Sequence, residues 1–441
     1  MLRFGTDGVR GDADTDLSTP LVVALGRAAA RVIGAAEFVV GRDTRESGPR
    51  IEADLVRGLT ADGARVRSLG VASTPAVAFV AQRADLPAAI VSASHNPWSD
   101  NGVKLLSRDG RKLAPDIEAA IETQAGALFD PALTGAAAGS GLSTPAPDPE
   151  ADLDLYVRHL LSALDGRTLD GLHVVVDCAN GAASELGPRA LVAAGARVDV
   201  INAQPDGRNI NAACGSTYPA HLQRAVVERN ANLGLAFDGD ADRVVAVDER
   251  GELVDGDQIM VMTALDWHQR AILRHDAIAV TVMSNLGLRR ALTAAGVDIV
   301  ETPVGDRNVI AAMADHDLVI GGEQSGHIVF ADLATTGDGV LTGLIVGDLL
   351  VRHAVPMSTL AAGMTRLPQV LVNVRLAPGV DLELPAVRDA ARRVETDLGE
   401  RGRLVLRRSG TEPVVRVMVE APTEAEAASA AAQVRAALEG E

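Results

Sequence analysis

Short apolar runs recur along the chain, and three of them end in polar loops. The runs cover residues 88–91, 233–237 and 318–320, and the loops that follow cover 92–97, 238–243 and 322–327. Apolar runs of this length, bounded by turn residues, are typical of buried strands. The sequence therefore predicts three buried strands, each of which presents polar side chains at its carboxyl end.

A longer pattern places these loops within a repeat. Each of three segments reads as the end of a helix, a capping glycine and a strand, and these are residues 59–69, 191–201 and 292–301. Each segment follows an apolar run with its own polar loop, at residues 38–48, 172–184 and 277–287. Three matches in phase indicate three copies of one unit. Alternating strands and helices predict mostly parallel sheets that are covered by helices.

The first predicted helix has a clear beginning. Thr19 is the expected N-cap, and Pro20 the first helical residue. Apolar side chains at helical spacing follow, namely Leu21, Leu25, Ala28 and Val32.

The last part of the chain has a different pattern. Residues 369–376, 404–406 and 414–420 read as strands, and residues 385–398 and the C-terminus read as helices. Thr423 and Glu426 have capping-box spacing for the last helix. These elements predict a small α+β domain.

The predicted fold is therefore of the α/β class. It has three similar α/β domains with mixed, mostly parallel sheets, plus a C-terminal α+β domain, arranged around a central cleft. Residues 134–149, rich in Gly, Ala, Ser and Pro, form the expected linker between the first two units. The predicted domains are residues 1–150, 151–252, 253–365 and 366–441.

Composition restricts the function. The chain has 441 residues, only 2% of them aromatic, and a net charge of -18, which disfavours a nucleic-acid partner. Neither an apolar run of 18 residues nor a signal-peptide core is present, so no membrane partner is expected. Two cysteines form no disulfide framework, and this favours the cytoplasm. Local Arg and Lys side chains would have to bind any anionic substrate.

The loop Ser92-Ala93-Ser94-His95-Asn96-Pro97 presents a hydroxyl, an imidazole and an amide together. Open α/β sheets place their chemistry at the carboxyl ends of strands. We therefore hypothesise that Ser94 is a nucleophile. The alternative is a polar turn with local hydrogen bonds.

The second loop carries three alternating carboxylates, those of Asp238, Asp240 and Asp242. In an extended loop this spacing points all three to one side. A hard divalent cation such as Mg²⁺ or Ca²⁺ would relieve their repulsion. An EF-hand is excluded, because Arg243 stands where that motif needs glycine. A phosphatase in which Asp238 is phosphorylated and a solvated acidic turn stay open as alternatives.

Three further stretches could line a site. Glu323 and Ser325 suit the vicinal hydroxyls of a sugar, although a polar loop fits them equally well. Residues 407–413 combine a guanidinium, two hydroxyls and a glycine, which suits a phosphate or a basic surface turn. The glycine-rich stretch 4–11 is either a hairpin or a loop that brings Arg10 into the site.

Together these motifs resemble those of the alpha-D-phosphohexomutases over essentially the whole chain. Within that superfamily they are most similar to the bacterial phosphoglucosamine mutases. The residues that carry the resemblance are 4–11, 92–97 with 100–104, 322–327 and 408–413.

The resemblance implies a role for each motif. Ser94 would carry a phosphoryl group, and a phosphoserine oxygen would join Asp238, Asp240 and Asp242 around Mg²⁺. The transferred group would be surrounded by Arg10, His95, Lys104 and Arg243, with His95 or Lys104 as the base. The sugar would face Glu323, Ser325 and His327. The phosphate that does not react would be bound by Arg407, Ser409, Gly410 and Thr411.

The implied reaction interconverts glucosamine 6-phosphate and glucosamine 1-phosphate. It proceeds through phospho-Ser94 and a sugar 1,6-bisphosphate, which also serves as the activator, and it supplies UDP-N-acetylglucosamine for cell-wall synthesis. A homodimer is the assembly to test. The alternatives are a phosphomannomutase or phosphoglucomutase, the phosphatase with Asp238 as nucleophile, and a Mg²⁺- and sugar-binding module without catalysis.

Overall fold

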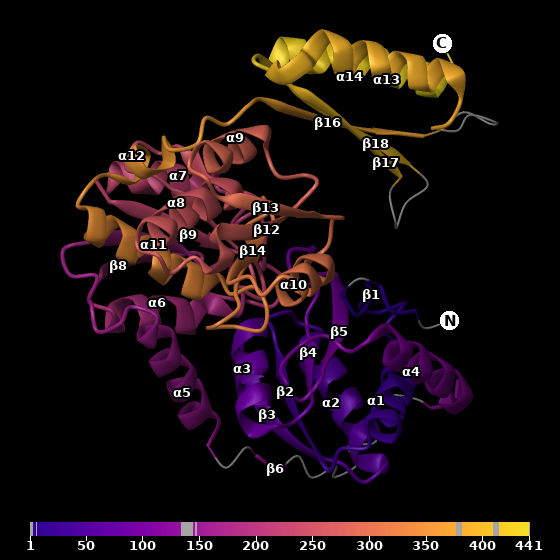
Figure 1. The fold of residues 1–441 in the computed structure, drawn as a ribbon. Helices are drawn as coiled ribbons and strands as arrows, with labels where there is room; N and C mark the ends of the chain where they lie inside the picture. The colour runs from indigo at the N-terminus through magenta and orange to yellow at the C-terminus, as the bar shows by residue number, and fades with distance from the viewer. Residues whose placement is uncertain are drawn as a thin grey trace.

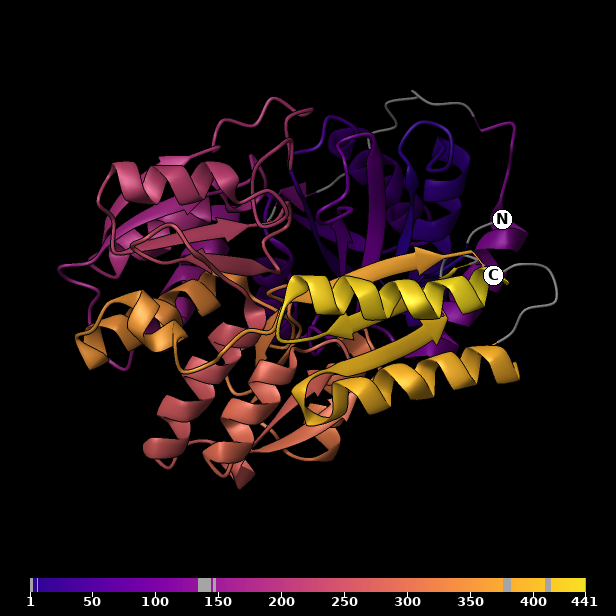
Figure 2. The same cartoon turned by 90° about the horizontal axis from the view of Figure 1, so that it is seen from above.

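Four β-sheets with helices packed against them make up the protein (Figures 1 and 2). The computed structural model describes residues 3–5, 7–133, 144–145, 148–375, 382–408 and 414–440. Most of the predicted linker, and the loop residues Ser409, Gly410 and Thr411, lie outside these residues. The four domain boundaries stay a prediction.

The first sheet has six strands in the order β1-β5-β4-β2-β3-β6. Their bounds are β1 Val9–Asp12, β2 Glu37–Arg42, β3 Arg65–Val71, β4 Ala88–Val91, β5 Asp100–Leu106 and β6 Thr144–Pro145. The helices of this part of the chain are α1 Thr19–Ile33, α2 Gly48–Ala61, α3 Thr74–Ala84 and α4 Pro115–Leu128.

The second sheet has the order β11-β10-β9-β7-β8. Its strands are β7 His173–Asp177, β8 Arg197–Ile201, β9 Leu233–Phe237, β10 Val244–Val247 and β11 Leu253–Val254. Its helices are α5 Pro149–Ser162, α6 Ala183–Ala193 and α7 Ala220–Glu228.

The third sheet has the order β13-β12-β14-β15. Its strands are β12 Ala277–Thr281, β13 Asp298–Thr302, β14 Ile320–Gly322 and β15 Ile328–Phe330. The helices of this part of the chain are α8 Gly256–Gln269, α9 Leu286–Ala294, α10 Asp306–Asp315, α11 Gly339–His353 and the short α12 Met357–Ala361, with a 3₁₀ turn at Arg274–Asp276. The strand predicted at 318–320 begins two residues later than expected.

The predicted repeat is confirmed by strand pairing. In each copy a central strand, β2, β7 or β12, has parallel neighbours on both sides. One of these neighbours, β4, β9 or β14, then turns back into an antiparallel partner. The polar loops 92–97, 238–243 and 323–327 occupy this same turn in the three copies.

The α+β prediction for the C-terminal part is also confirmed. The strands β16 Gln369–Val374, β17 Arg403–Arg408 and β18 Val415–Glu420 form an antiparallel sheet with β18 in the middle. The helices α13 Pro385–Leu398 and α14 Glu424–Glu439 lie side by side on one face of this sheet (Figure 1). Thr423 caps α14, because its hydroxyl accepts a hydrogen bond from the amide of Glu426 at 3.2 Å.

One local expectation is corrected, and one helix packs outside its own part of the chain. Ser18 is the N-cap of α1, so Thr19 is its first helical residue and Pro20 its second. Helix α11 follows the third sheet in the chain, but it packs on β9 and β10 of the second sheet. A Cβ on Gly343 of α11 would lie 2.7 Å from Leu235, so the missing side chain permits this close packing.

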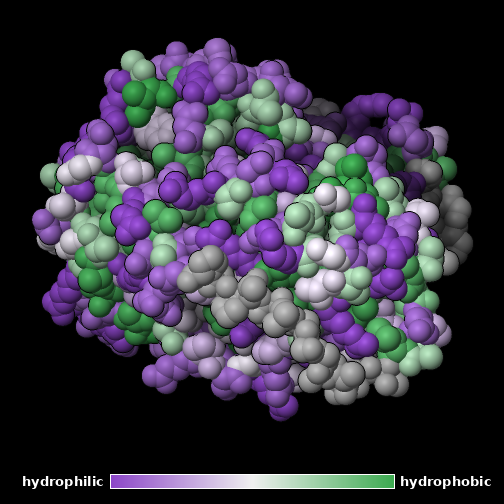
Figure 3. Space-filling model, turned by 90° about the horizontal axis from the view of Figure 1, so that it is seen from below, coloured by the Kyte–Doolittle hydropathy of each residue, from purple (hydrophilic) through white to green (hydrophobic). Residues whose placement is uncertain are grey.

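Hydrophilic and hydrophobic residues are mixed on the face that Figure 3 shows. On the part of the face that Figure 3 shows and the structure describes, hydrophobic residues lie in small groups between hydrophilic ones. Among the described residues, none of the helices has the length and the apolar character that crossing a membrane requires.

Candidate active site

The three equivalent loops meet at one place. The hydroxyl of Ser94 in the first loop donates a hydrogen bond of 2.6 Å to Oδ2 of Asp238 in the second. The strand that follows the second loop contacts the third loop, since the main-chain amide of Val244, the first residue of β10, donates to the carbonyl of Gly326 at 3.1 Å. The convergence expected from the repeat is therefore present.

Ser94 has an unusual backbone conformation. Its φ is 53°, in the left-handed region, and the residue is fully buried. A residue other than glycine pays about 1–2 kcal/mol for this conformation. Such strain persists where the surrounding structure imposes it, often at a functional site.

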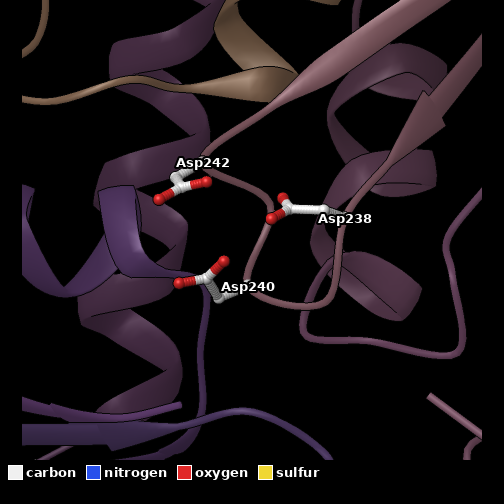
Figure 4. Close-up of side chains that lie close together, drawn as sticks. All are labelled: Asp238, Asp240 and Asp242. Carbon is white, nitrogen blue, oxygen red and sulfur yellow. The ribbon is translucent and has the colours of Figure 1, made fainter. Parts of the chain in front are cut away.

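The three carboxylates of the second loop form a compact, buried cluster (Figure 4). One oxygen atom from each of Asp238, Asp240 and Asp242 lies within 4.8 Å of the others. The loop is a turn with Ala241 at a φ of 57°, and not the extended segment that the sequence suggested. The side chains converge because the turn wraps around them.

This cluster fits a hard cation. Among the described residues, the Oδ1 atoms of Asp240 and Asp242 are buried without a hydrogen-bond partner. Burial, then the charges of Asp242 and Asp240, raises the pKa of Asp238 well above its usual range. Carboxylate oxygens that repel one another in this way are suitable ligands for Mg²⁺ or Ca²⁺.

Lys104 on β5 faces the same cluster. Its ammonium lies 2.8 Å from Asp240 Oδ2, 3.0 Å from Asp7 Oδ2 and 3.5 Å from Asp242 Oδ2, and the residue is 3% exposed. Burial opposes the charge, but these carboxylates outweigh it and raise the pKa of Lys104. Lys104 is therefore a buried, positively charged group beside Asp240.

Two arginines add positive charge. The Arg243 guanidinium lies 3.7 Å from Asp242 Oδ1, and neighbouring carboxylates raise the pKa of Arg243 against the effect of burial. Arg10 on β1 is paired with Asp7. The charge of Arg10 acts on both His95 and Lys104.

His95 lies between the serine and these cations. Its Nδ1 atom is 3.4 Å from Ser94 Oγ and 3.3 Å from a guanidinium nitrogen of Arg243. Burial, then the charges of Arg243 and Arg10, lowers the pKa of His95 to about 4. The imidazole is therefore neutral at neutral pH.

The third loop brings a mixed group of side chains. Glu323 is half-buried and accepts a hydrogen bond of 3.0 Å from the amide of Gly305. Ser325 is exposed, whereas His327 is buried and lies 3.8 Å from the Asp306 carboxylate. Glu323 and Ser325 thus differ in exposure.

The fourth predicted group is only partly described. Arg407 on β17 stands directly opposite Arg416 on β18. Burial and the charge of Arg416 lower the pKa of Arg407. Two cations held this close favour an anion between them. Ser409, Gly410 and Thr411 of the same loop lie outside the described residues.

Several groups at this site were not predicted. Asp7 contacts Lys104 and Lys112, and Lys112 reaches Asp306 of the third unit at 2.6 Å. Thr74 donates a hydrogen bond of 2.6 Å to Asp240 Oδ2. Asp7 stands within the glycine-rich N-terminal motif, which was a usable signal. For the other residues, only the packing of different units brings them together.

Comparison with known proteins covers the four units. Residues 1–129, 154–251 and 255–367 match phosphoglucomutase/phosphomannomutase alpha/beta/alpha domains I, II and III, and residues 371–437 match the C-terminal domain of the same proteins. The chain belongs to this phosphohexomutase family. As a member of it, the protein is an isomerase, an intramolecular phosphotransferase.

Curated relatives cover nearly the whole chain. A phosphoglucosamine mutase of Salinispora arenicola is 50% identical over 433 residues, which are 96% of this chain and 94% of the relative. A phosphoglucosamine mutase of Mycobacterium tuberculosis is 47% identical over 444 residues, 99% of this chain and 98% of the relative.

Solved structures show the same fold. A phosphoglucomutase/phosphomannomutase family protein of Burkholderia thailandensis matches with a TM-score of 0.80 at 24% identity, over 99% of this chain and 98% of the other. The Aspergillus fumigatus N-acetylphosphoglucosamine mutase, solved with GlcNAc-6P and magnesium, matches with a TM-score of 0.71 at 21% identity, over 99% and 96% of the two chains.

Proposed function

We propose that the protein interconverts glucosamine 6-phosphate and glucosamine 1-phosphate. The observation that carries this proposal is the buried Ser94 hydroxyl, 2.6 Å from one carboxylate of a compact acidic cluster. Relatives about 50% identical over nearly the full chain carry the name phosphoglucosamine mutase. Serine, carboxylates and cations in this arrangement suit phosphoryl transfer.

The reaction begins from phospho-Ser94. A sugar hydroxyl attacks the phosphorus, a new P–O bond to the sugar forms, and the bond to Ser94 Oγ breaks. The proton that the sugar hydroxyl loses ends on Ser94 Oγ, so atoms and charge balance. The product is a sugar 1,6-bisphosphate and free Ser94. In the second half, Ser94 takes the phosphoryl group from the other end of the sugar.

Mg²⁺ would be held by Asp238, Asp240 and Asp242 together with an oxygen of phospho-Ser94. When bound, the ion supplies positive charge next to the oxygens of the transferred group. Lys104, Arg10 and Arg243 supply the fixed positive charge of the chain itself, which phosphoryl transfer requires.

A base must take and return the proton. His95 Nδ1 lies 3.4 Å from Ser94 Oγ, within reach of a proton exchanged there. Lys104 is instead held by three carboxylates. The positions of these two side chains therefore favour His95 as the base and Lys104 as a source of charge.

The bisphosphate has to turn round between the two halves of the reaction. We assign the contacts with the sugar to Glu323, Ser325 and His327, beside the acidic cluster. We assign the phosphate at the far end to the C-terminal domain, through Arg407, Ser409, Gly410 and Thr411. One such phosphate site can bind either end of the bisphosphate, because both ends carry the same group.

Glucosamine, glucose and mannose 6-phosphates distinguish the family alternatives. We expect kcat/KM to be highest for glucosamine 6-phosphate, measured with Mg²⁺ and a catalytic amount of a sugar 1,6-bisphosphate as activator. A preference of more than about tenfold for mannose or glucose phosphate would instead assign a phosphomannomutase or phosphoglucomutase.

Replacement of the nucleophile tests the mechanism. Ser94→Ala should reduce turnover by about 10⁴-fold or more, because no group remains to carry the phosphoryl group. Ser99→Ala is the matched control in the same loop and should retain activity. Mass spectrometry should find phosphate on Ser94. Phosphate on Asp238 alone, with turnover unchanged in Ser94→Ala, would instead support the aspartate-nucleophile phosphatase.

The setting of the reaction is also part of this proposal. We place it in the cytoplasm, where glucosamine 1-phosphate would supply UDP-N-acetylglucosamine for cell-wall synthesis. The assembly is proposed to be a homodimer, which light scattering of the purified protein can test.

A further inference from the structure

A buried arginine lies under the serine loop and takes no part in the chemistry proposed above. Arg45, in the loop between β2 and α2, is 1% exposed. Its guanidinium donates hydrogen bonds of 2.9 Å to the carbonyl oxygens of Ser94, Asn96 and Asp100, and it also donates to the carbonyl of Pro97. A single side chain thus bonds three carbonyl groups of the serine loop and that of Asp100, where β5 begins.

The amide side of Ser94 is held through the same arginine. Arg45 Nε lies 2.9 Å from Oδ2 of the fully buried Asp43. That carboxylate oxygen also accepts a 2.6 Å hydrogen bond from the hydroxyl of Ser92. The Ser92 oxygen in turn accepts a 2.9 Å hydrogen bond from the amide of Ser94. The two main-chain polar groups of Ser94 are therefore connected through Asp43 and Arg45.

A third contact comes from the second unit. The amide nitrogen Nδ2 of Asn211 donates to the carbonyl of Ser94 at 2.9 Å and to that of Asn96 at 3.2 Å. Asn211 has a φ of 58°, and its own main-chain amide is bonded to the carbonyl of Ala179. The Ser94 carbonyl thus has one donor from each of two units, the units that also carry Ser94 and Asp238.

We propose that Asp43, Arg45, Ser92 and Asn211 form a serine brace, a set of positioning residues for the phosphoryl-transfer reaction. The brace holds Ser94 in its left-handed conformation and thereby directs Oγ toward Asp238. None of the four residues needs to touch the sugar or the transferred phosphate. This inference rests on the proposed function, because it specifies how the nucleophile of that reaction is oriented.

The alternative is that Arg45 and Asp43 only neutralise each other's buried charge and have no part in positioning Ser94. Buried charges need partners in any case, so loss of stability alone would not distinguish the two interpretations. The brace makes a narrower prediction. Substrate binding should be retained while the chemical step slows, since a small displacement of a reacting atom costs about a hundredfold in rate.

Two variants test the brace, one at Arg45 in the first unit and one at Asn211 in the second. Arg45→Lys keeps the charge but cannot bond four carbonyls at once. Asn211→Gly removes the amide donor, and glycine accepts the positive φ without strain. The matched control is Arg50→Ala, because Arg50 donates instead to the main-chain carbonyls of Leu17 and Ala13.

We expect kcat to fall by about a hundredfold in Arg45→Lys and about tenfold in Asn211→Gly, with KM for glucosamine 6-phosphate within about threefold of the unaltered protein. Arg50→Ala should keep both constants. Crystal structures of the two brace variants should show Ser94 outside the positive-φ region or Oγ turned away from Asp238.

Folded variants that retain kcat within about twofold, with Ser94 unmoved, would overturn the brace. If Arg45→Lys does not fold, Asn211→Gly decides by the same criterion. A failure of the proposed function gives a different result, because the unaltered protein would then lack mutase activity. In that case the position of Ser94 in the variant structures still tests the brace.

Discussion

At the scale of single residues, the site is a balance of buried charges. Asp238, Asp240 and Asp242 lie close together in a buried turn, and Lys104 pairs most closely with Asp240. Asp242 lies farther from Lys104, with its Oδ2 at 3.5 Å, and its Oδ1 accepts no hydrogen bond among the described residues, although Arg243 Nε lies 3.7 Å away. The Asp242 carboxylate is therefore better suited to bind a metal ion than to pair with another side chain of the protein.

We predict that Asp242→Asn weakens Mg²⁺ binding without destabilising the metal-free protein. The substitution removes one of three mutually repelling charges and keeps the size of the side chain. Binding affinity for Mg²⁺, measured by calorimetry, should fall by about tenfold or more, as is usual when a metal site is disturbed. The melting temperature in EDTA should stay the same or rise.

Asp248→Asn provides the control for that experiment. Asp248 is also a buried acidic residue of the second unit, but its carboxylate caps the turn to Glu252 and lies outside the acidic cluster. It should leave Mg²⁺ affinity unchanged. If Asp242→Asn bound Mg²⁺ as tightly as the unaltered protein, Asp242 would not be a ligand.

At the scale of elements, helix α8 begins with two buried acids. Asp255 is its N-cap, and the carboxylate accepts a 3.1 Å hydrogen bond from the amide of Gln258. Asp257 in the first turn accepts a 2.6 Å hydrogen bond from the main-chain amide of Asn285. Burial, then the charge of Asp255, raises the pKa of Asp257 to about 7. Glu420 of the C-terminal domain adds to this effect.

A raised carboxyl pKa makes stability depend on pH. The folded protein holds the Asp257 proton up to about pH 7, whereas the unfolded chain releases it near the usual value of 3.8. The contribution of this group is therefore fully present below pH 3.8 and is lost as the pH rises to about 7. The shift corresponds to a change on the order of 4 kcal/mol.

We predict that Asp257→Asn gains stability relative to the unaltered protein as the pH rises from 5 to 8. Asparagine can still accept the hydrogen bond from Asn285 but carries no charge to bury. Thermal melting at several pH values measures the difference. Asp298→Asn, at an exposed carboxylate that begins β13, should give a difference independent of pH. A constant difference for Asp257→Asn as well would contradict the prediction.

Elements were predictable because their signals are local. The apolar runs at 88–91 and 233–237 match β4 and β9, and in each repeat a glycine follows the end of the helix. The acidic cluster was predictable for the same reason, since its three residues share one turn. The loop geometry was not, because Ala241 and Ser94 adopt positive φ values that their residue types do not favour.

Contacts between units left no such signal. Asn211 reaches the Ser94 carbonyl across 117 residues of sequence, and Lys112 reaches Asp306 across 194. The sequence of the stretch 38–48 did not indicate that Arg45 would bond the serine loop. These contacts depend on how the units pack, and single-sequence patterns do not encode that arrangement.

At the scale of the whole molecule, the C-terminal domain contacts the third unit through Arg403 and Glu420, which also pair with each other. Glu420 at the end of β18 is 0% exposed and lies 2.7 Å from Arg403 Nε. Arg403 also donates to the carbonyl of Val282 at 3.1 Å and to that of Ser284. The Glu420 carboxylate accepts a 2.9 Å hydrogen bond from the amide of Leu286. Charge-assisted hydrogen bonds thus connect the C-terminal sheet to residues 282–286 of the third unit.

This junction bears on catalysis because the proposed phosphate site lies on the same small sheet. Arg403 begins β17, and Arg407 stands on the same strand. The orientation of the sheet therefore determines where the Arg407 guanidinium lies relative to the acidic cluster. A looser junction would lower the fraction of molecules in which both ends of the substrate are bound.

We predict that Arg403→Ala raises KM for glucosamine 6-phosphate by about tenfold and lowers kcat by a smaller factor, because the distant phosphate contact is lost more often than the reacting groups are disturbed. Amide hydrogen exchange at Ser284 and Leu286 should accelerate. Arg401→Ala is the control, since Arg401 is exposed and pairs only loosely with Glu426 at 3.7 Å. Slower turnover with KM and exchange unchanged would instead place the effect of Arg403 at the reacting groups.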